Sequence, residues 1–240
     1  MHLRLSCICV ILGLAAAASA AAQRAGAFSA SRDHPAIAYS ADSATTAVTD
    51  LTRKIQNGAV KLSFDPANGY LRSLLDALAI PIESQVLVFS ETSFQAKKIN
   101  RTNPRAVFFN DHVAVGFVRG GDILEIAAQD PRQGTIFYQL AQTDAGGAHI
   151  TRNDQCLSCH LSWETLAVPG PQVLSVFPRR SDDEYANGGH IDGRSPIEDR
   201  WGGWYVTGLR VPARQMGNLE LLQPTMPAGG AKPVPARRSL

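Results

Sequence analysis

Residues 106–140 decide the fold, and they read AVFFNDHVAVGFVRGGDILEIAAQDPRQGTIFYQL. Apolar runs with the composition of β-strands cover 106–109, 112–118, 123–128 and 135–140, and short groups of turn-forming residues separate them. Because links this short join strands that run in opposite directions, the stretch predicts an antiparallel meander.

The same stretch predicts a sheet with one buried face. Leu124 and Ile126 alternate with Glu125, so the two apolar side chains share a face and the carboxylate points away from them. We therefore expect the apolar face to cover a core and Glu125 to face solvent. Residues 84–90 predict an additional strand, which extends the meander over 84–141.

Two helices are predicted ahead of the meander. Apolar positions recur at helical spacing in 46–57 and in 70–79, and a glycine and a proline end these segments. The chain after Gly147 is rich in loop-forming residues, with a short helix expected over about 154–166. The fold class is therefore α+β, with N-terminal helices, a central antiparallel β-meander and a loop-rich C-terminal segment.

The N-terminus predicts export. A basic residue precedes an apolar run over 5–18, and small residues follow it, as in a secretory signal peptide over 1–22. The run is shorter than the roughly 20 residues that a membrane span needs. We therefore expect cleavage after Ala20 or Ala22, a periplasmic location and no membrane span in the mature chain.

The remaining chain divides by composition. Residues 23–45 are rich in Ala, Ser and Thr and predict a flexible leader, whereas Pro, Ala and Gly dominate 223–240 and predict a disordered tail. A single domain is expected between them, over 46–222. The formal net charge of +2 gives no bulk attraction to nucleic acid or to an anionic membrane, so neither is expected as a partner.

The mature chain keeps one close cysteine pair, in the sequence Cys156-Leu157-Ser158-Cys159-His160. On a helical turn the two sulfurs can point to the same side, where each can add to one vinyl group of a haem. His160 then reaches the iron as an axial ligand. The motif therefore predicts one covalent haem c, and attachment outside the cytoplasm agrees with the export signal.

Other uses of a cysteine pair fit this sequence less well. A zinc site would need a second pair of ligands at short spacing, and the mature sequence has no such pair. A thioredoxin-like pair would open the first long helix of a βαβ unit, whereas this pair follows a meander late in the chain. Such a redox pair, or a simple local disulfide, stays as the weaker alternative.

Several stretches resemble a family of bacterial exported proteins that contain a cytochrome c domain. They are 109–120, 124–131, 156–160 and 200–208, and the last of these, RWGGWYVTG, is the most specific. The resemblance covers about 37–218. It implies that 46–222 is a cytochrome c-like domain with a haem segment over 150–218, and that the protein binds haem and transfers electrons.

The resemblance also shows two departures from the family pattern. A histidine commonly stands just before Met-Gly-Asn or Leu-Gly-Asn, and another follows the Asp of Asp-x-x-Ser-Pro. Gln215 and Gly193 occupy those positions here. The sixth iron ligand is therefore open to Met216, His190, Met226 or water. A Met thioether is a common axial partner, and we prefer Met216 because it follows the Trp-rich segment at a position where a loop can return to the haem.

Residues around the motif suggest how the cofactor is held. The turn over 168–171 can present a backbone carbonyl to the ring nitrogen of His160 that does not bind iron. Arginines can pair with the haem propionates and tryptophans can cover the porphyrin. The candidates of these two types are Arg152, Arg194, Arg200, Trp163, Trp201 and Trp204.

The sequence favours a periplasmic haem protein that relays single electrons to or from an unidentified redox partner protein. This function needs Cys156, Cys159 and His160 but no catalytic residue. Two alternatives use an open distal site, namely a haem-dependent peroxidase or oxidoreductase subunit and a haem-based sensor.

Overall fold

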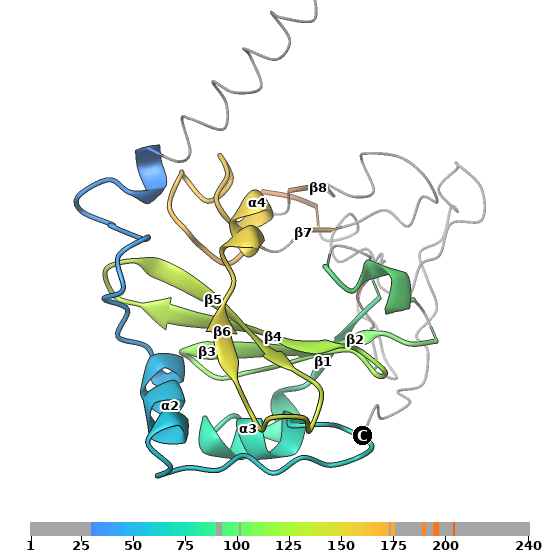
Figure 1. Cartoon of the computed structure of the whole chain (residues 1–240). Helices are drawn as coiled ribbons and strands as arrows, with labels where there is room; N and C mark the ends of the chain where they lie inside the picture. The colour runs from blue at the N-terminus through green and yellow to red at the C-terminus, as the bar shows by residue number, and fades with distance from the viewer. Residues whose placement is uncertain are drawn as a thin grey trace, which may run out of the picture.

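The computed structural model describes residues 30–89, 93–100, 102–172, 174–175, 189–190, 194–196 and 204 (Figure 1). The helices with both ends in these ranges are α2 (Ala47–Gln56), α3 (Leu71–Ala77) and α4 (Leu157–His160), with 3-10 turns η1 (Ile82–Ser84), η2 (Ala96–Lys98) and η3 (Asp154–Cys156). The strands are β1 (Val86–Val88), β2 (Arg105–Phe109), β3 (Val113–Phe117), β4 (Ile123–Asp130), β5 (Gly134–Ala141), β6 (Ile150–Arg152), β7 (Leu174–Ser175) and β8 (Gly189–His190). The predicted signal peptide and C-terminal tail lie outside the described residues.

A six-stranded antiparallel sheet forms the centre of the molecule. Its strand order is β1-β2-β3-β4-β5-β6, so every strand pairs with its neighbour in sequence and the predicted meander is confirmed. Gly120 and Gly134 take the left-handed conformation at two of the hairpins, with φ of 69° and 80°. Glycine carries little penalty for that conformation, which explains why these links are tight.

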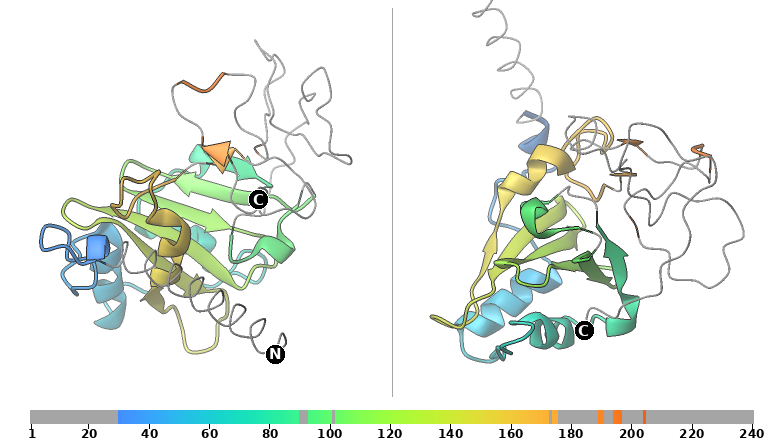
Figure 2. Two further views of the ribbon diagram at one scale, coloured as in Figure 1. Left: turned by 90° about the horizontal axis from the view of Figure 1, so that it is seen from above. Right: turned by 90° about the vertical axis from the view of Figure 1, so that its right-hand side faces the viewer.

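The sheet separates two layers, as Figures 1 and 2 show. Helices α2 and α3 cover one face, whereas α4, which carries the end of the cysteine motif, lies over the other face. The helix-covered face holds the main core, which includes Leu71, Leu74, Phe108, Val115, Leu124, Ile126, Ile136 and Leu140, all fully or almost fully buried. Both predicted N-terminal helices and the α+β class are therefore confirmed.

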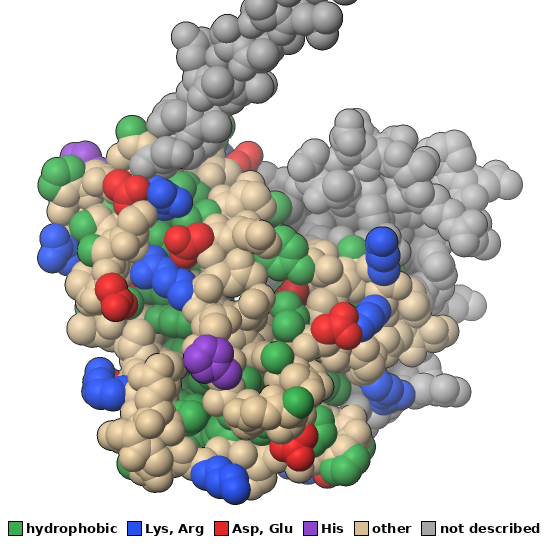
Figure 3. Space-filling view, in the orientation of Figure 1, with side chains coloured by type: hydrophobic (Ala, Val, Ile, Leu, Met, Phe, Trp, Pro, Cys, Tyr) green, Lys and Arg blue, Asp and Glu red, His purple; other side chains and the backbone are tan. Residues whose placement is uncertain are grey.

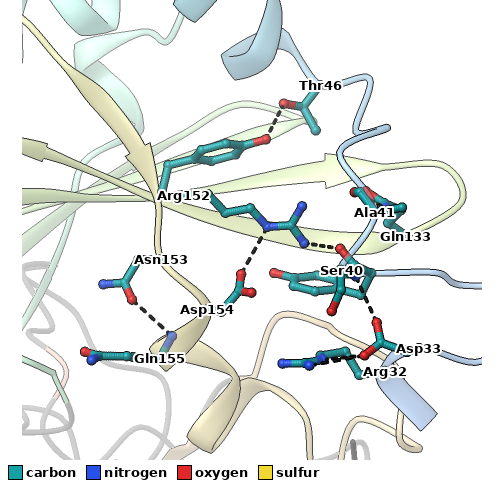
Figure 4. Close-up of polar contacts among 12 residues, drawn as sticks. Arg32, Asp33, Ser40, Ala41, Thr46, Gln133, Arg152, Asn153, Asp154 and Gln155 are labelled. Carbon is teal, nitrogen blue, oxygen red and sulfur yellow. Dashed lines mark hydrogen bonds and ion pairs between the residues drawn. The ribbon is translucent and has the colours of Figure 1, made fainter. Parts of the chain in front are cut away.

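Residues 30–45, named here the N-terminal strap, pack against the sheet, although a flexible leader was expected over 23–45 (Figure 4). Residues 23–29 lie outside the described residues. Tyr39 is fully buried. The Nε2 of Gln133 donates to the carbonyl oxygen of Ala38 at 2.6 Å, and the backbone N–H of Thr45 donates to Asp130 Oδ2 at 2.7 Å. The strap is ordered because residues from the β4–β5 hairpin, far along the chain, supply its hydrogen-bond partners.

The edges of the sheet hold two further features. Strand β6 was not predicted, since the sequence after Gly147 suggested loops, yet it pairs antiparallel with β5. At the opposite edge, Trp204 forms an isolated antiparallel bridge with Val88 of β1. Each edge strand is thus only three residues long, and β1 is also paired at Val88.

The described surface is mixed in charge, and Figure 3 shows basic and acidic side chains interspersed on one face. This agrees with a formal net charge of +2 for the chain. Within the described residues, no helix combines the length and the apolar character that crossing a bilayer demands.

Candidate haem-binding site

The cysteine motif begins directly after the edge strand β6, and Asn153 fixes its starting point. The backbone N–H of Asn153 donates to the carbonyl oxygen of Phe137 at 2.9 Å, and its side-chain Nδ2 donates to Gln139 Oε1 at 3.0 Å. Its Oδ1 accepts the backbone N–H of Gln155 at 3.0 Å, which caps η3. Asn153 therefore ties the first turn of the motif to β5 before Cys156 is reached.

Arg152, the last residue of β6, has a structural role (Figure 4). Its Nε donates to Asp154 Oδ1 at 3.0 Å, its Nη2 donates to the carbonyl oxygen of Tyr39, and its guanidinium lies 4.1 Å from the centre of the Tyr39 ring. These contacts hold the N-terminal strap against the sheet. The described contacts of Arg152 are therefore structural, with Asp154 and Tyr39 as its partners.

His160 and Gly170 form a reciprocal pair. The backbone N–H of Gly170 donates to the carbonyl oxygen of His160 at 3.0 Å, and the ring Nδ1 of His160 lies 3.0 Å from the carbonyl oxygen of Gly170. A carbonyl oxygen can only accept, so Nδ1 carries the proton and the neutral ring keeps its lone pair on Nε2. The expected carbonyl from the turn over 168–171 is therefore confirmed, and Gly170 is the residue that supplies it.

The loop that carries Gly170 is held by the β4–β5 hairpin. The backbone N–H of Thr135 donates to the carbonyl oxygen of Pro169 at 2.9 Å. A Cβ at Gly134 would collide with that same carbonyl oxygen, so the loop packs where the hairpin has no side chain. The orientation of His160 thus depends on a hairpin that precedes the motif in the sequence.

The environment of His160 favours its neutral, ligating form. Its ring packs against Phe137 of β5, with ring centroids 4.5 Å apart and an angle of 41° between the planes. Burial lowers the pKa of His160, the hydrogen bond to Gly170 opposes this in part, and the positive charge of Arg105 lowers the pKa further. The pKa of the imidazole therefore lies below its usual value of 6.5.

The two cysteines differ in their surroundings. Neither is in a disulfide, and Cys156 is half-buried whereas Cys159 is exposed. Burial raises the pKa of Cys156 to about 11, with a further contribution from the negative charge of Glu125. A thioredoxin-like cysteine has a lowered pKa, because its thiolate must be available as a nucleophile. The raised pKa of Cys156 argues against that use.

Glu125 does not face open solvent, which corrects the sequence-based expectation. Its side chain is 21% exposed and forms an ion pair of 3.2 Å with Arg105, which is 19% exposed. The hydroxyl of Ser93, which precedes η2, also donates to Glu125 Oε1 at 2.7 Å, so residues from outside β4 cover the carboxylate. Both faces of the sheet are therefore partly buried, one by α2 and α3 and the other by the motif.

The other suggested cofactor contacts are only partly described. His190 lies in β8 and pairs with Leu174 of β7. Leu174 is four positions after Gly170 in the sequence. Trp163 is 75% exposed, so its side chain is not part of the core. The preferred sixth ligand, Met216, lies outside the described residues, as do Arg200, Trp201 and Met226.

The chain was compared with protein families, with curated proteins and with solved structures, and none of them matched. Among the residues that the structure describes, no three or more His, Cys, Asp or Glu side chains gather as a group that could hold a metal ion. The site is therefore characterised by its own residues. These are a histidine whose Nδ1 carries the proton, a half-buried thiol with a raised pKa and a second, exposed thiol.

Proposed function

We propose that the chain is an exported haem protein that relays single electrons, with one haem c attached through thioether bonds to Cys156 and Cys159. His160 would be an axial ligand, and the bound haem would supply a one-electron iron couple. The rest of the chain would attach the cofactor, orient the imidazole and limit access of water. Its redox partner would be another protein.

The pairing of His160 with Gly170 is the observation that carries this proposal. Metal-binding histidines in proteins usually donate their second ring N–H to a carbonyl or carboxylate, which fixes the tautomer and strengthens donation from the other nitrogen. His160 has that arrangement with its Nδ1, and its lowered pKa leaves Nε2 unprotonated at neutral pH. The residues present therefore fit an axial iron ligand.

The sixth position distinguishes a relay from a catalyst or a sensor. We propose Met216 as the ligand there, on the sequence grounds given above, with His190 as the alternative. A six-coordinate haem transfers electrons without binding small ligands, whereas an open position permits peroxide or gas chemistry. Reduced spectra with and without carbon monoxide separate these functions, and a haem that binds carbon monoxide readily would exclude the relay.

The test of attachment is the intact mass of the mature chain, produced in a bacterial host that attaches haem outside the cytoplasm. We expect a mass increase of one haem in the wild type and in Ser158→Ala, a matched control between the two cysteines. The double variant Cys156→Ala, Cys159→Ala should lack the increment. A colourless wild-type chain, with both thiols free or joined to each other, would exclude the proposal.

A further inference from the structure

The Arg105–Glu125 ion pair crosses an entire strand of the sheet. Arg105 lies on β2 and Glu125 on β4, and β3 runs between them. Gly116 of β3 pairs with Glu125 on one side and, on the other, with Val107, which is two positions from Arg105 on the same face of β2. Strands two apart are separated by about 10 Å, so an intervening side chain would stand between the charged groups. A Cβ at Gly116 would lie 3.4 Å from Glu125 Oε2 and 3.5 Å from Arg105 Cδ. Gly116 leaves the ion pair room to lie flat on the sheet.

The hydrogen bonds of this pair are unevenly satisfied. Both carboxylate oxygens of Glu125 have partners, because Oε1 accepts the hydroxyl of Ser93 at 2.7 Å and Oε2 accepts Nη1 of Arg105 at 3.2 Å. The Nε of Arg105 is buried and has no hydrogen-bond partner within the described part of the chain. Buried donors in folded proteins are rarely left without an acceptor. Arg105 therefore needs an acceptor that Glu125 does not supply.

The ion pair lies on the sheet face that carries the cysteine motif. Glu125 and Ala127 point to the same face of β4, and Ala127 is registered with Phe137 of β5. Phe137 in turn supports the ring of His160 at a centroid distance of 4.5 Å. Glu125 is thus a diagonal cross-strand neighbour of the residue that packs on the axial histidine.

We propose that Arg105 binds a carboxylate of the covalently held cofactor, a haem propionate, through the Nε edge of its guanidinium. Glu125 holds the guanidinium through Nη1, and Ser93 in turn holds Glu125. The inference rests on the proposed function, because it names a contact of the same cofactor. A guanidinium suits this task, since its planar fork matches a carboxylate and its charge is permanent. Arg105 would be a positioning residue rather than an axial ligand.

The test measures the reduction potential of the holoprotein between about pH 5 and pH 8, where propionates titrate when they lack a cationic partner. In the wild type we expect little change with pH, because Arg105 keeps the propionate ionised. Arg105→Met should lower the potential and make it vary with pH. Arg105→Lys should lie between the two. The matched control is Arg72→Met, which removes one exposed positive charge from α3, on the other side of the sheet.

Arg105 forms an ion pair with Glu125 and its charge acts on His160. The double variant Arg105→Met, Glu125→Gln therefore tests whether Glu125 is the source of the pH dependence. It also avoids leaving the charge of the half-buried Glu125 without its ion-pair partner, which protects the fold. If the potential still varies with pH in the double variant, Glu125 is not the titrating group. The propionate is then the titrating group, because the ring of His160 would be held by the iron as an axial ligand. If the variation disappears, Arg105 serves only Glu125 and the inference is overturned.

The mass measurement keeps this inference separate from the proposed function. A wild-type chain without haem would contradict both the proposed function and the role of Arg105. If the wild-type chain carries haem, but Arg105→Met and Arg72→Met change the reduction potential by the same amount, only the role of Arg105 would be contradicted.

Discussion

Replacing Asp130 with asparagine tests how the N-terminal strap is held. Asp130 is buried at the end of β4, where its Oδ1 accepts the backbone N–H groups of Gln133 at 2.7 Å and Arg132 at 2.9 Å. Its Oδ2 accepts the backbone N–H of Thr45 at 2.7 Å. Asparagine has the same shape but only one acceptor oxygen. In either amide orientation, an NH2 group therefore faces at least one backbone N–H.

The expected loss follows from these bonds. A hydrogen bond to a charged group contributes about 1.5–3 kcal/mol, so the free energy of unfolding of Asp130→Asn should fall by about 2–3 kcal/mol at pH 7. Burial raises the pKa of Asp130, but the N–H groups of Gln133, Thr45 and Arg132 together outweigh it and hold the pKa below 3.8. The stabilisation is therefore present above pH 3.8 and is lost as the pH falls through the lower pKa of the folded state.

Urea unfolding of the mature chain at pH 7 and near pH 3 measures this difference. The gap between wild type and Asp130→Asn should be widest at pH 7 and should narrow at the lower pH. Asp76→Asn, at an exposed position of α3, is the matched control and should differ little from wild type. If Asp130→Asn behaves like this control at pH 7, the carboxylate does not hold the strap.

Three further substitutions test the support of the site. Gly134→Ala should displace the loop at Pro169 and destabilise the fold by more than about 1 kcal/mol. The reason is that φ of Gly134 is 80° and a Cβ would meet the Pro169 carbonyl oxygen. An unchanged melting temperature would contradict this packing. Arg152→Met should release the strap around Tyr39, seen as faster proteolysis N-terminal to α2 than in Arg72→Met. Asn153→Ala should cost about 1–3 kcal/mol by removing a cap and a side-chain hydrogen bond, and should lower the yield of attached haem; full yield with normal stability would show that the cap is dispensable.

Features that depend on neighbouring residues were predictable from the sequence. The hairpins at Gly120 and Gly134 carry local turn signals, so the meander and its order could be derived without any long-range contact. The carbonyl partner of His160 also lies close in sequence, only as far away as Gly170. Because few backbone conformations connect two residues this close in sequence, the contact between the His160 ring and a carbonyl of 168–171 could be predicted.

Features that depend on distant residues were not predictable. The strap looks like a low-complexity leader because its order comes from Asp130, Gln133 and Arg152, each about 85 to 113 positions further along. Strand β6 is too short to show a periodicity. Glu125 alternates with apolar neighbours as a solvent-facing residue would, and only the fold brings Ser93 and Arg105 against its carboxylate. The sixth ligand remains a proposal, since Met216 lies outside the described residues.

The bridge between Trp204 and Val88 bears on how much of the sheet edge is open to another chain. A long open strand at the margin of a sheet offers unpaired N–H and C=O groups to any other chain that arrives in an extended form. Here one margin is a strand of three residues, β6, and the other, β1, also has three residues and is paired at Val88 by a segment from much later in the sequence. A strand from another molecule would therefore find few unpaired backbone groups at either edge of the sheet.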